Sequence, residues 1–440
     1  MRHVVRAGLG GLALTAVLGL ASAATAAAQF AANPGGTPSG PTVVSMGGTA
    51  NIGNPFANFV FAPRSLVSVA GFDPNAPSYF ANDPKYSGVV SIFIPSSPGS
   101  NSGFICSGTL LPTRHHILTA AHCLTGADGS PIGTTPTVVF NTLADGSAGN
   151  TNVQIVAKSV TINPGYTGAI IDQNDIAIID LSQNAPSWAR SYEVYTGNGV
   201  GQNFNLVGYG RRGTGATGLT QGASFFNRRQ GLNRYDFTLA DAAFNGTFNF
   251  GLAGTCTGNW WVCRYSLFGP GIINPNGFDV YMSDFDNGVV TSGYPLQDSS
   301  CLLDDALLTS FIPGSPNFTA LTGTCDLGQG LSEVSVGGGD SGGPQFINGR
   351  IAGVTSFGLT FGCPAVLVTP NGQVCAFDSD NSLNSSFGEF AGYTRVDLHA
   401  QWIYNTTPEP VSMALLGTGL AGIGGAGFFR RRRKQDTPES

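Results

Sequence analysis

The chain carries few charged residues. Only 10% of its 440 residues are Asp, Glu, Lys or Arg, and the formal net charge is −6. The two ends, residues 1–28 and 408–440, hold seven of the 20 basic residues but only three of the 26 acidic ones, so the part between them has a net charge of about −10. An acidic domain repels a phosphate backbone. We therefore expect no nucleic-acid partner.

The sequence also lacks long helical periodicity. No segment before residue 390 repeats apolar residues at helical spacing over a long run, and no G-x-G-x-x-G follows a predicted strand. Rossmann and TIM-barrel folds, which alternate strands with helices, are therefore disfavoured. The apolar residues fall instead in short β-branched runs between Gly, Pro, Asn and Asp, which is typical of an antiparallel barrel or sandwich. These runs are 89–94, 103–111, 117–119, 137–140, 153–162, 176–181 and 205–208.

Residues 1–28 have the order of a secretory signal peptide. Basic residues near the start precede an apolar run from Ala7 to Leu20, and small residues follow up to Ala28. We predict cleavage before Gln29 and export of the mature protein. The run is shorter than the roughly 20 apolar residues of a membrane anchor. Eight cysteines, an even number in an exported chain, favour disulfides.

Residues 405–440 contain a second pattern related to membranes. Pro408-Glu409-Pro410 precedes an uncharged span over residues 411–429, and a run of Arg and Lys follows from Arg430 to Lys434. The span is long enough to cross a bilayer, and the basic cluster predicts that its C-terminal end faces the cytoplasm. A buried core helix is a poor alternative because it would end in five consecutive positive charges.

Between these ends the sequence divides into two regions. Residues 29–83 are rich in Gly, Pro and Asn, and we interpret them as a leader or propeptide-like region. Residues 84–404 form the predicted main domain, with an insertion from about 211 to 300 that is rich in Asn and Phe. Val396, Ala400 and Ile403 share one helical face, which predicts a closing helix.

Residues 337–344, Gly-Gly-Gly-Asp-Ser-Gly-Gly-Pro, surround one Asp-Ser pair with glycine. Glycine tolerates positive φ and close approach, so this loop can present the Ser341 hydroxyl. A serine becomes a nucleophile only beside a base that a third group orients. His122, in Thr-Ala-Ala-His-Cys, follows a predicted strand, and Asp175, in Asn-Asp-Ile-Ala, begins an apolar strand. Burial there can keep the Asp175 carboxylate aimed at an imidazole.

The other histidines and the nearby Asp172 are better explained by structural roles than by catalysis. His115 and His116 precede the strand and lie outside the motif, so we predict a structural role for both. His399 lies on the closing helix, where packing is favoured over catalysis. Asp172 is followed by polar residues, so we prefer Asp175 as the catalytic acid.

Residues 284–288, Asp-Phe-Asp-Asn-Gly, could form a calcium-binding turn. They lack the later Glu of an EF-hand loop, so an Asx-rich turn is favoured. We predict neither a metal nor a cofactor for this protein.

Three motifs, in the chain order His, Asp, Ser, resemble those of the trypsin/chymotrypsin-like serine peptidases. They are the motifs of His122, Asp175 and Ser341. Matching runs cover roughly residues 84–404, excluding the insertion. The resemblance implies an all-β fold of two six-stranded antiparallel barrels, with the long insertion, a C-terminal helix and the catalytic groups in the cleft between the barrels.

The resemblance also implies individual roles. Ser341 Oγ would attack a peptide carbonyl, His122 would carry its proton to the leaving amine, and Asp175 would orient the imidazole and stabilise its cation. The N–H groups of Gly339 and Ser341 would form the oxyanion hole. Asp340 would shape the loop without reacting.

Three further residues would contact the substrate. Ser356 and Gly358 would lie along the substrate backbone, which would pair with them as an added strand. Ser335 stands six positions before Ser341, where the family places the base of the specificity pocket. Because no acid is present there, we expect a preference for an uncharged side chain over Lys or Arg.

The cysteines depart in part from the family pattern. Cys106 lies 17 positions before Cys123, and a disulfide between them would brace the loop that carries His122. Gly337 replaces the cysteine that the family usually has three positions before the Asp of its motif, so one family disulfide is missing. The remaining pairs that we suggest are Cys363 with Cys375, Cys301 with Cys325, and Cys256 with Cys263.

The sequence also lacks the activation site that is common in the family. Many members are zymogens whose new α-amino group, in an Ile-Val-Gly-Gly-like start, pairs with the Asp beside the nucleophile. Nothing like that start occurs about 12 residues before Gly88, and Arg64-Ser65 is followed by the wrong sequence. Asp340 is therefore open to another partner.

The tail resembles the PEP-CTERM sorting signal of Gram-negative bacteria. That resemblance implies an exosortase-type transpeptidase that cuts near residues 408–410 and moves the protein to the cell surface or matrix. Otherwise the span would remain an inner-membrane anchor. The leading hypothesis is a secreted, surface-directed serine endopeptidase acting on polypeptides. The alternatives are a non-catalytic surface or matrix binding protein on the same scaffold, and an esterase with the same triad.

Overall fold

A computed structural model gives the structure of the chain. It describes residues 42–45, 68–71, 73–126, 129–146, 149–169, 171–240, 279–286, 288, 290–291, 294–295, 297–304, 328–359, 366–369, 372–375, 379 and 383–408. The expected signal peptide, the span over 411–429 and the cysteines 256, 263, 325 and 363 lie outside these residues. None of the helices described is both long enough and apolar enough to span a membrane.

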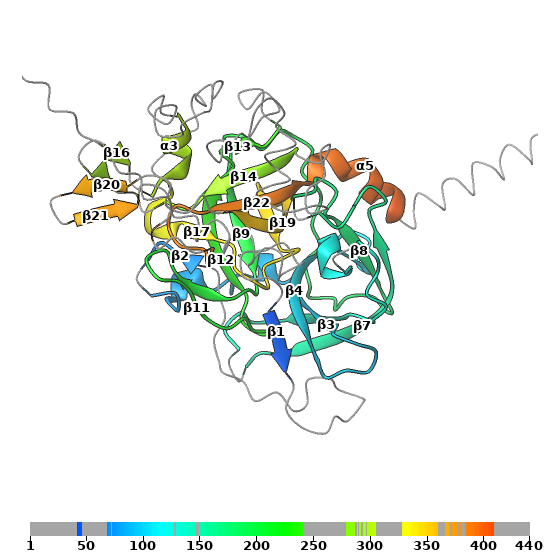
Figure 1. The fold of residues 1–440 in the computed structure, drawn as a ribbon. Coiled ribbons are helices and arrows are strands. Elements are labelled where there is room, and N and C mark those ends of the chain that lie inside the picture. The colour runs from blue at the N-terminus through cyan, green and yellow to red at the C-terminus, as the bar shows by residue number, and fades with distance from the viewer. Residues whose placement is uncertain are drawn as a thin grey trace, which may run out of the picture.

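The first barrel is a closed antiparallel sheet of six strands (Figure 1). The strands pair in the order β4-β3-β6-β7-β8-β5, and β5 returns to β4. Closure leaves none of these strands as a free edge. The short strand β1 (Thr42–Ser45) adds to β4 at residues 102–105. The six barrel strands are β3 (Val89–Pro95), β4 (Ser102–Leu110), β5 (His116–Thr119), β6 (Thr137–Asn141), β7 (Asn152–Ile162) and β8 (Ala177–Leu181).

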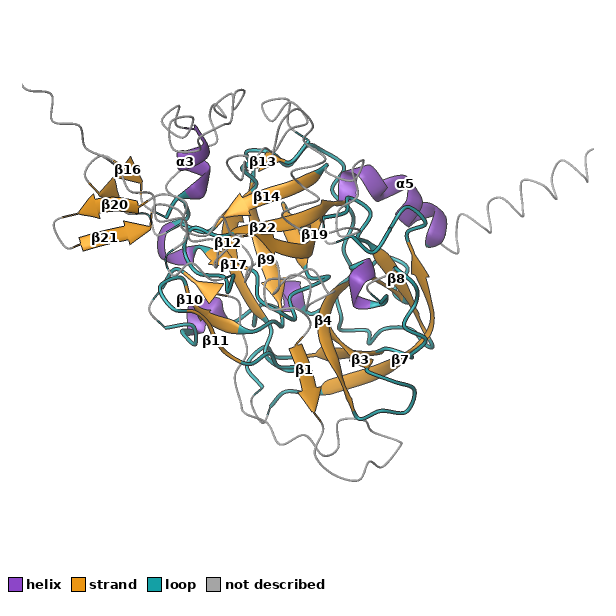
Figure 2. Cartoon of the chain, viewed as in Figure 1, coloured by secondary structure: helices purple, strands orange, loops and turns teal. Residues whose placement is uncertain are grey.

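The second barrel is built on an antiparallel sheet in the order β12-β9-β18-β19-β22-β14-β13. Among the described residues no pairing joins β12 to β13, so this sheet is a half-barrel. Its strands are β9 (Asn203–Gly208), β12 (Arg229–Arg234), β13 (Phe237–Thr238), β14 (Val280–Asp284), β18 (Pro344–Ile347), β19 (Arg350–Leu359) and β22 (Phe390–Arg395). Together with the closed first barrel, this confirms the expected all-β, chymotrypsin-like fold (Figure 2).

Strands β12, β13 and β14 fall within residues 211–300, the range interpreted from sequence as an insertion. Their pairing with β9 and β22 makes them part of the second sheet. Residues 241–278, in the middle of that range, lie outside the described residues.

Apolar strand residues fill both barrels. In the first barrel, Val90, Ile92 and Val138 have no exposed surface. In the second, the rings of Tyr235 and Tyr281 stack at 4.2 Å between centroids. Burial of apolar side chains contributes roughly 1.5–3 kcal/mol each, so these two cores hold the barrels together.

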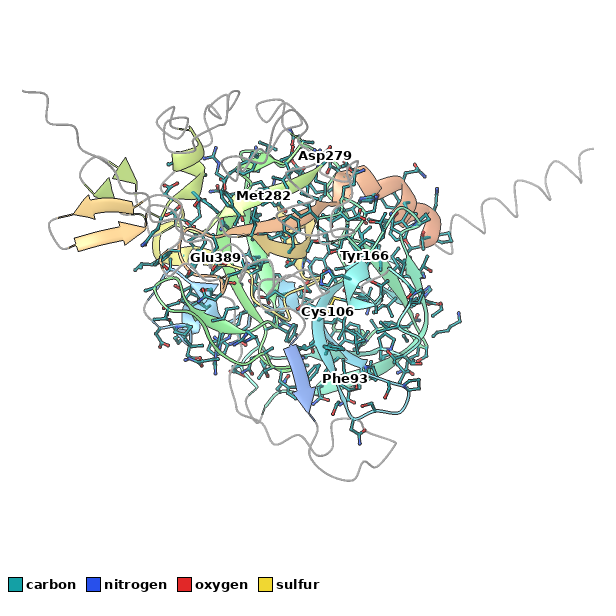
Figure 3. All side chains as sticks on the ribbon, in the orientation of Figure 1. Phe93, Cys106, Tyr166, Asp279, Met282 and Glu389 are labelled. Carbon is teal, nitrogen blue, oxygen red and sulfur yellow. A yellow bond between two sulfur atoms is a disulfide. The ribbon has the colours of Figure 1, made fainter. Side chains whose placement is uncertain are left out.

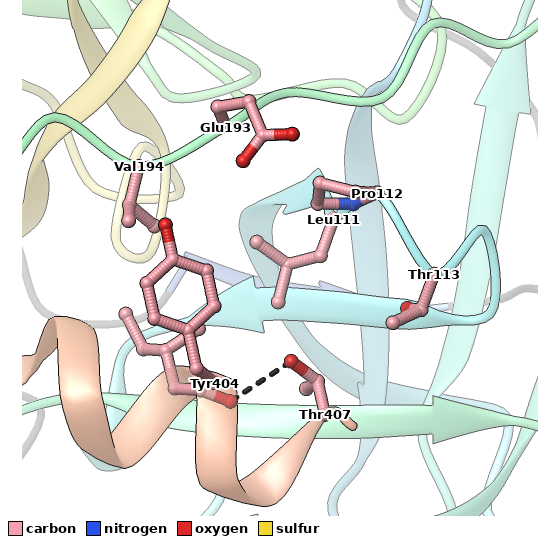
Figure 4. Close-up of a pocket in the computed structure, with 8 residues that line it drawn as sticks. Leu111, Pro112, Thr113, Glu193, Val194, Tyr404 and Thr407 are labelled. Atoms are coloured by element: carbon pink, nitrogen blue, oxygen red, sulfur yellow. Dashed lines mark hydrogen bonds between the residues drawn. The ribbon is translucent and has the colours of Figure 1, made fainter. Parts of the chain in front are cut away.

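Helix α5 (Val396–Thr406) follows the second barrel, which confirms the helix that the apolar spacing predicted, and it packs on the first barrel. Val396 and Ile403 are buried. His399 is also buried, and its ring nitrogens contact the Asn163 amide and the Gln173 carbonyl oxygen. Around its C-terminal end lies a small pocket, lined on the helix side by Ile403, Tyr404 and Thr407 and on the barrel side by residues 111–113 and 193–194 (Figure 4). The helix therefore fixes the end of the second barrel to the first.

The remaining sheets and helices are short. A small sheet contains β11 (Gly218–Gln221), β10 (Arg212–Thr214), β2 (Ser68–Val69) and β17 (Val334–Ser335). Two-stranded pairs are β15 (Val290–Thr291) with β16 (Tyr294–Pro295), and β20 (Val366–Thr369) with β21 (Gly372–Cys375). The short helices are η1 (Pro77–Tyr79), η2 (Pro84–Tyr86), η3 (Ala121–Cys123), α3 (Ser299–Asp304) and η5 (Gly330–Ser332).

Candidate active site

The loop that carries His122 is braced by a disulfide. Cys106 on β4 is bonded to Cys123 at the end of η3, with their Cα atoms 6.4 Å apart. This confirms the pairing suggested by the sequence. Cys106 lies near the middle of the molecule, where the two barrels meet (Figure 3). The bond therefore holds η3 against the junction between the barrels.

His122 and Asp175 are joined by two hydrogen bonds. The imidazole Nδ1 lies 2.6 Å from Asp175 Oδ2, and the His122 backbone N–H donates to Oδ1 at 2.8 Å. Both side chains are buried, at 6% and 2% exposure. The strands explain the contact: His122 follows β5, Asp175 precedes β8, and Thr119 pairs with Ala177 in the β5–β8 ladder. Two residues 53 positions apart are thus placed side by side.

The Asp175 carboxylate also binds the second barrel. The Ser356 hydroxyl on β19 donates to Oδ2, and the Thr394 hydroxyl on β22 donates to the Asp175 backbone carbonyl. Burial alone would raise the pKa of Asp175. The neighbouring charge of His122 and the hydrogen bonds from His122 and Ser356 outweigh that effect and lower the pKa below its ordinary value. The carboxylate is therefore ionised at neutral pH.

Ser356 has a contact that the sequence did not indicate. Its expected place along the substrate backbone stays a prediction, and its side chain is directed at Asp175. The β19–β22 register shifts between Thr355 and Phe357, which marks a β-bulge. A bulge turns a side chain away from regular alternation, and strand periodicity alone could not reveal it. Gly358, two residues on, pairs with Ala391 in the same ladder.

Ser341 lies beside the His122 loop. Its carbonyl oxygen accepts from the Ser107 N–H at 2.8 Å and is 3.7 Å from Cys123 Sγ. The same sulfur is 3.9 Å from His122 Nε2. Ser341 Oγ is buried and has no hydrogen-bond partner among the described residues. The structure thus joins His122 to Asp175 directly and brings Ser341 next to them without a hydrogen bond from its hydroxyl.

The glycine loop is shaped around the Asp340 side chain. Oδ1 accepts from the Gly210 N–H at 2.7 Å and Oδ2 from the Gly337 N–H at 2.8 Å. Burial raises the pKa of Asp340 to about 7, although these two hydrogen bonds oppose the shift. Gly339 has φ 106° and Gly342 has φ 80°, values that favour glycine. Backbone amides are therefore the partners of the carboxyl group beside the candidate nucleophile.

The backbone N–H groups of Gly339 and Ser341 donate to no other group within the described part of the chain. By contrast, the N–H groups of Asp340, Gly342 and Gly343 all donate to carbonyl oxygens. The two amides expected to form an oxyanion hole are thus distinct from the amides that stabilise the loop.

The other residues considered in the sequence have local contacts of their own. Ser335 is buried on β17, where it pairs with Ser68 of β2. The Asp172 carboxylate accepts from Thr167 and from the Asn174 N–H within its own turn. Asp286 Oδ1 accepts from the Gly288 N–H at 2.7 Å, which is the geometry of an Asx turn.

Comparison with known proteins adds family evidence. The family model described as trypsin matches residues 82–259, a range that includes His122 and Asp175 and ends before Ser341. The match supports a trypsin-like serine peptidase scaffold. No curated protein matches the chain.

Among solved structures, the chain is similar to the scabies mite inactivated protease paralogue S-D1. The identity is 14%, the TM-score is 0.38, and the similarity covers 73% of this chain and 93% of that one. A likeness at this level supports no conclusion about activity.

The contact between Gly210 and Asp340 predicts a steric effect. A Cβ at Gly210 would lie 2.4 Å from Asp340 Oδ2 and 2.5 Å from its Cγ, so Gly210→Ala must displace a buried, doubly hydrogen-bonded carboxyl group. We expect a loss of about 1–3 kcal/mol in the free energy of unfolding, measured by urea titration. Gly222→Ala is the matched control, because nothing lies within 4 Å of its added Cβ. Equal stability of the two variants would contradict this account of the loop.

Proposed function

We propose that the protein is a secreted serine endopeptidase that hydrolyses peptide bonds in polypeptides through an acyl-enzyme. One observation carries the proposal: the buried Asp175 carboxylate binds both the ring and the backbone of His122, in a loop that also contacts Ser341. These residues come from three separated motifs, and a binding module has no chemical need to bring them together.

Asp175 would set the protonation of His122. The ionised carboxylate next to Nδ1 favours the tautomer with the proton on Nδ1, which leaves Nε2 as a base. Nε2 would take the proton of Ser341 Oγ as that oxygen attacks the carbonyl carbon of the substrate. The imidazolium would then donate this proton to the leaving amine. Water would repeat the two steps on the acyl-enzyme and release the acid product.

The N–H groups of Gly339 and Ser341 would stabilise the oxyanion of each tetrahedral intermediate. Their proposed role is supported by their lack of other acceptors among the described residues. A single donor of this kind typically contributes about 10²–10³ in kcat. The substrate backbone would pair with β19 near Ser356 and Gly358, and Ser335 would give the pocket an uncharged base. No metal or cofactor enters this mechanism.

The alternative is a non-catalytic binding protein on the same scaffold. It is favoured by one observation: Ser341 Oγ has no hydrogen bond to His122 within the described residues. Catalytic hydrogen bonds are, however, often long or poorly aligned in the free enzyme and tighten when substrate binds. We therefore retain the peptidase as the better-supported function.

Covalent labelling with a fluorophosphonate tests the nucleophile. We expect the processed wild-type protein to be labelled and Ser341→Ala to remain unlabelled, because only an activated serine attacks phosphorus readily. Ser97→Ala, on an exposed loop, serves as the matched control and should be labelled like the wild type. If the wild type and Ser341→Ala were equally silent, the binding-protein alternative would be preferred.

The Asp175–His122 bond predicts a kinetic effect. Asp175→Asn would favour the tautomer with the proton on Nε2, which cannot act as the base toward Ser341. This should lower kcat on a labelled casein substrate by about 10⁴-fold, with little change in KM. Asp172→Asn is a control in the same turn, since its carboxylate contacts Thr167 and Asn174. Similar losses of kcat in both variants would count against Asp175 as the residue that orients His122.

We further propose that the tail is a PEP-CTERM-type sorting signal, recognised by an exosortase-type enzyme that releases the protein from the inner membrane to the cell surface. Replacing Pro408, Glu409 and Pro410 together by Ala should keep the protein in the inner-membrane fraction. Asn405→Ala, in an exposed residue at the end of α5, should leave fractionation unchanged. Normal release of the triple variant would exclude this signal.

A further inference from the structure

Two histidines and one aspartate lie together on the first barrel, apart from the residues of the proposed triad. His116 begins β5, His115 directly precedes it, and Asp180 is the register partner of His116 on β8. Asp180 Oδ1 is 2.9 Å from His115 Nδ1 and 3.9 Å from His116 Nε2. The two imidazole centroids are 4.0 Å apart. One ligand atom from each of the three residues therefore lies within 4.8 Å of the others.

We propose that His115, His116 and Asp180 form a binding site for one late first-row transition-metal ion, with Zn²⁺ as the best match. Imidazole nitrogen and carboxylate oxygen are ordinary zinc ligands, at about 2.0–2.2 Å from the ion. A set of two imidazoles and one carboxylate also disfavours Ca²⁺ and Mg²⁺, which prefer oxygen ligands. Three protein ligands would leave a fourth position for water.

The Asp180 carboxylate presents its two oxygens to different partners. Oδ1 is directed at both imidazoles, whereas Oδ2 binds Lys158 Nζ at 3.0 Å. Lys158 lies where the register of β7 against β8 shifts, and its side chain is 68% exposed. A metal ion could therefore bind Oδ1 without displacing the lysine, and the flexible ammonium group can move into solvent.

Thr113 orients His116 for this role. Its hydroxyl oxygen is 2.8 Å from His116 Nδ1. With the proton on Nδ1 donated to Thr113, the lone pair on Nε2 is directed toward Asp180. Outer partners of this kind are typical of metal-ligating histidines.

His115 needs one rearrangement of its proton. Its Nδ1 faces Asp180 Oδ1 as a hydrogen-bond donor. Metal binding at Nδ1 requires the tautomer that carries the ring proton on Nε2. The His115 side chain is 32% exposed, which allows exchange of that proton with solvent.

A metal ion bound here would stabilise the fold of the first barrel. It joins the start of β5 to the end of β8, and the opposite ends of the same two strands lead to His122 and Asp175. The four residues of β5 alone span about 10 Å of extended strand, so the two sites lie at least that far apart along it. A bound ion would therefore fix the β5–β8 pair without contacting the reacting groups.

Zinc binding by the full-length chain tests the proposal. The protein carries Ser341→Ala to prevent self-cleavage, is purified in mild detergent and is stripped with EDTA. Isothermal titration with Zn²⁺ should give one ion per chain, and saturating Zn²⁺ should raise the Tm. Because activity is absent from this background, the outcome is independent of the proposed peptidase function.

Variants of the site sharpen the test. His115→Gln should weaken Zn²⁺ binding at least 10-fold, and Thr113→Val should weaken it about 10- to 100-fold through loss of the outer partner. Lys158→Gln should tighten binding, since it removes a positive charge beside the ion. Asp83→Asn is the matched control, because Asp83 is also paired with a lysine but lies elsewhere.

Two results would overturn the proposal: no stoichiometric binding by the parent protein, or unchanged affinity in His115→Gln. Both His115 and Lys158 are partly exposed, so their variants should fold normally, and circular dichroism in EDTA verifies this. His116→Gln is omitted as a primary test because His116 is buried.

Discussion

The buried carboxylate of Asp175 is the interaction on which the rest of the site depends. A charge that is 2% exposed is costly unless hydrogen bonds replace its water. Those bonds come from both barrels: His122 belongs to the first, and Ser356 to the second. His122 contacts both carboxylate oxygens, and Ser356 adds a second hydrogen bond to Oδ2 from the other barrel. The first barrel thus places Asp175 against the His122 ring, and the second barrel holds the carboxylate in that position.

A second set of contacts at the same junction fixes the glycine loop. The Ser107 N–H donates to the Ser341 carbonyl, the Ser107 hydroxyl donates to the Gly339 carbonyl, and the Tyr209 N–H donates to that hydroxyl. Ser107 directly follows Cys106, so the disulfide that braces His122 also positions the residue that holds the loop. The candidate base and the candidate nucleophile are therefore anchored through adjacent residues of β4.

Much of this arrangement was predictable from sequence, and the remainder has physical causes. His122, Asp175 and the glycine loop stand in distinctive motifs, and the barrel strands have β-branched runs. Strand β12 was missed because Arg228 and Arg229 suggest a surface loop, yet Arg228 is fully buried and donates to the Ala81 and Asn141 carbonyl oxygens. The amide partners of Asp340 leave no trace in sequence, because every residue except proline has an N–H.

The Ser341 side chain has fewer hydrogen bonds than the backbone around it. Its carbonyl is held by Ser107, and the next residue, Gly342, donates to the Thr355 carbonyl at 2.9 Å. The hydroxyl itself has no hydrogen-bond partner within the described residues. Rotation between the staggered χ1 positions moves Oγ while the backbone stays in place. A fixed backbone with a rotatable hydroxyl would suit acyl transfer, because Oγ would first give its proton to the base and bond to the substrate carbonyl carbon, and would later leave that carbon and take a proton back.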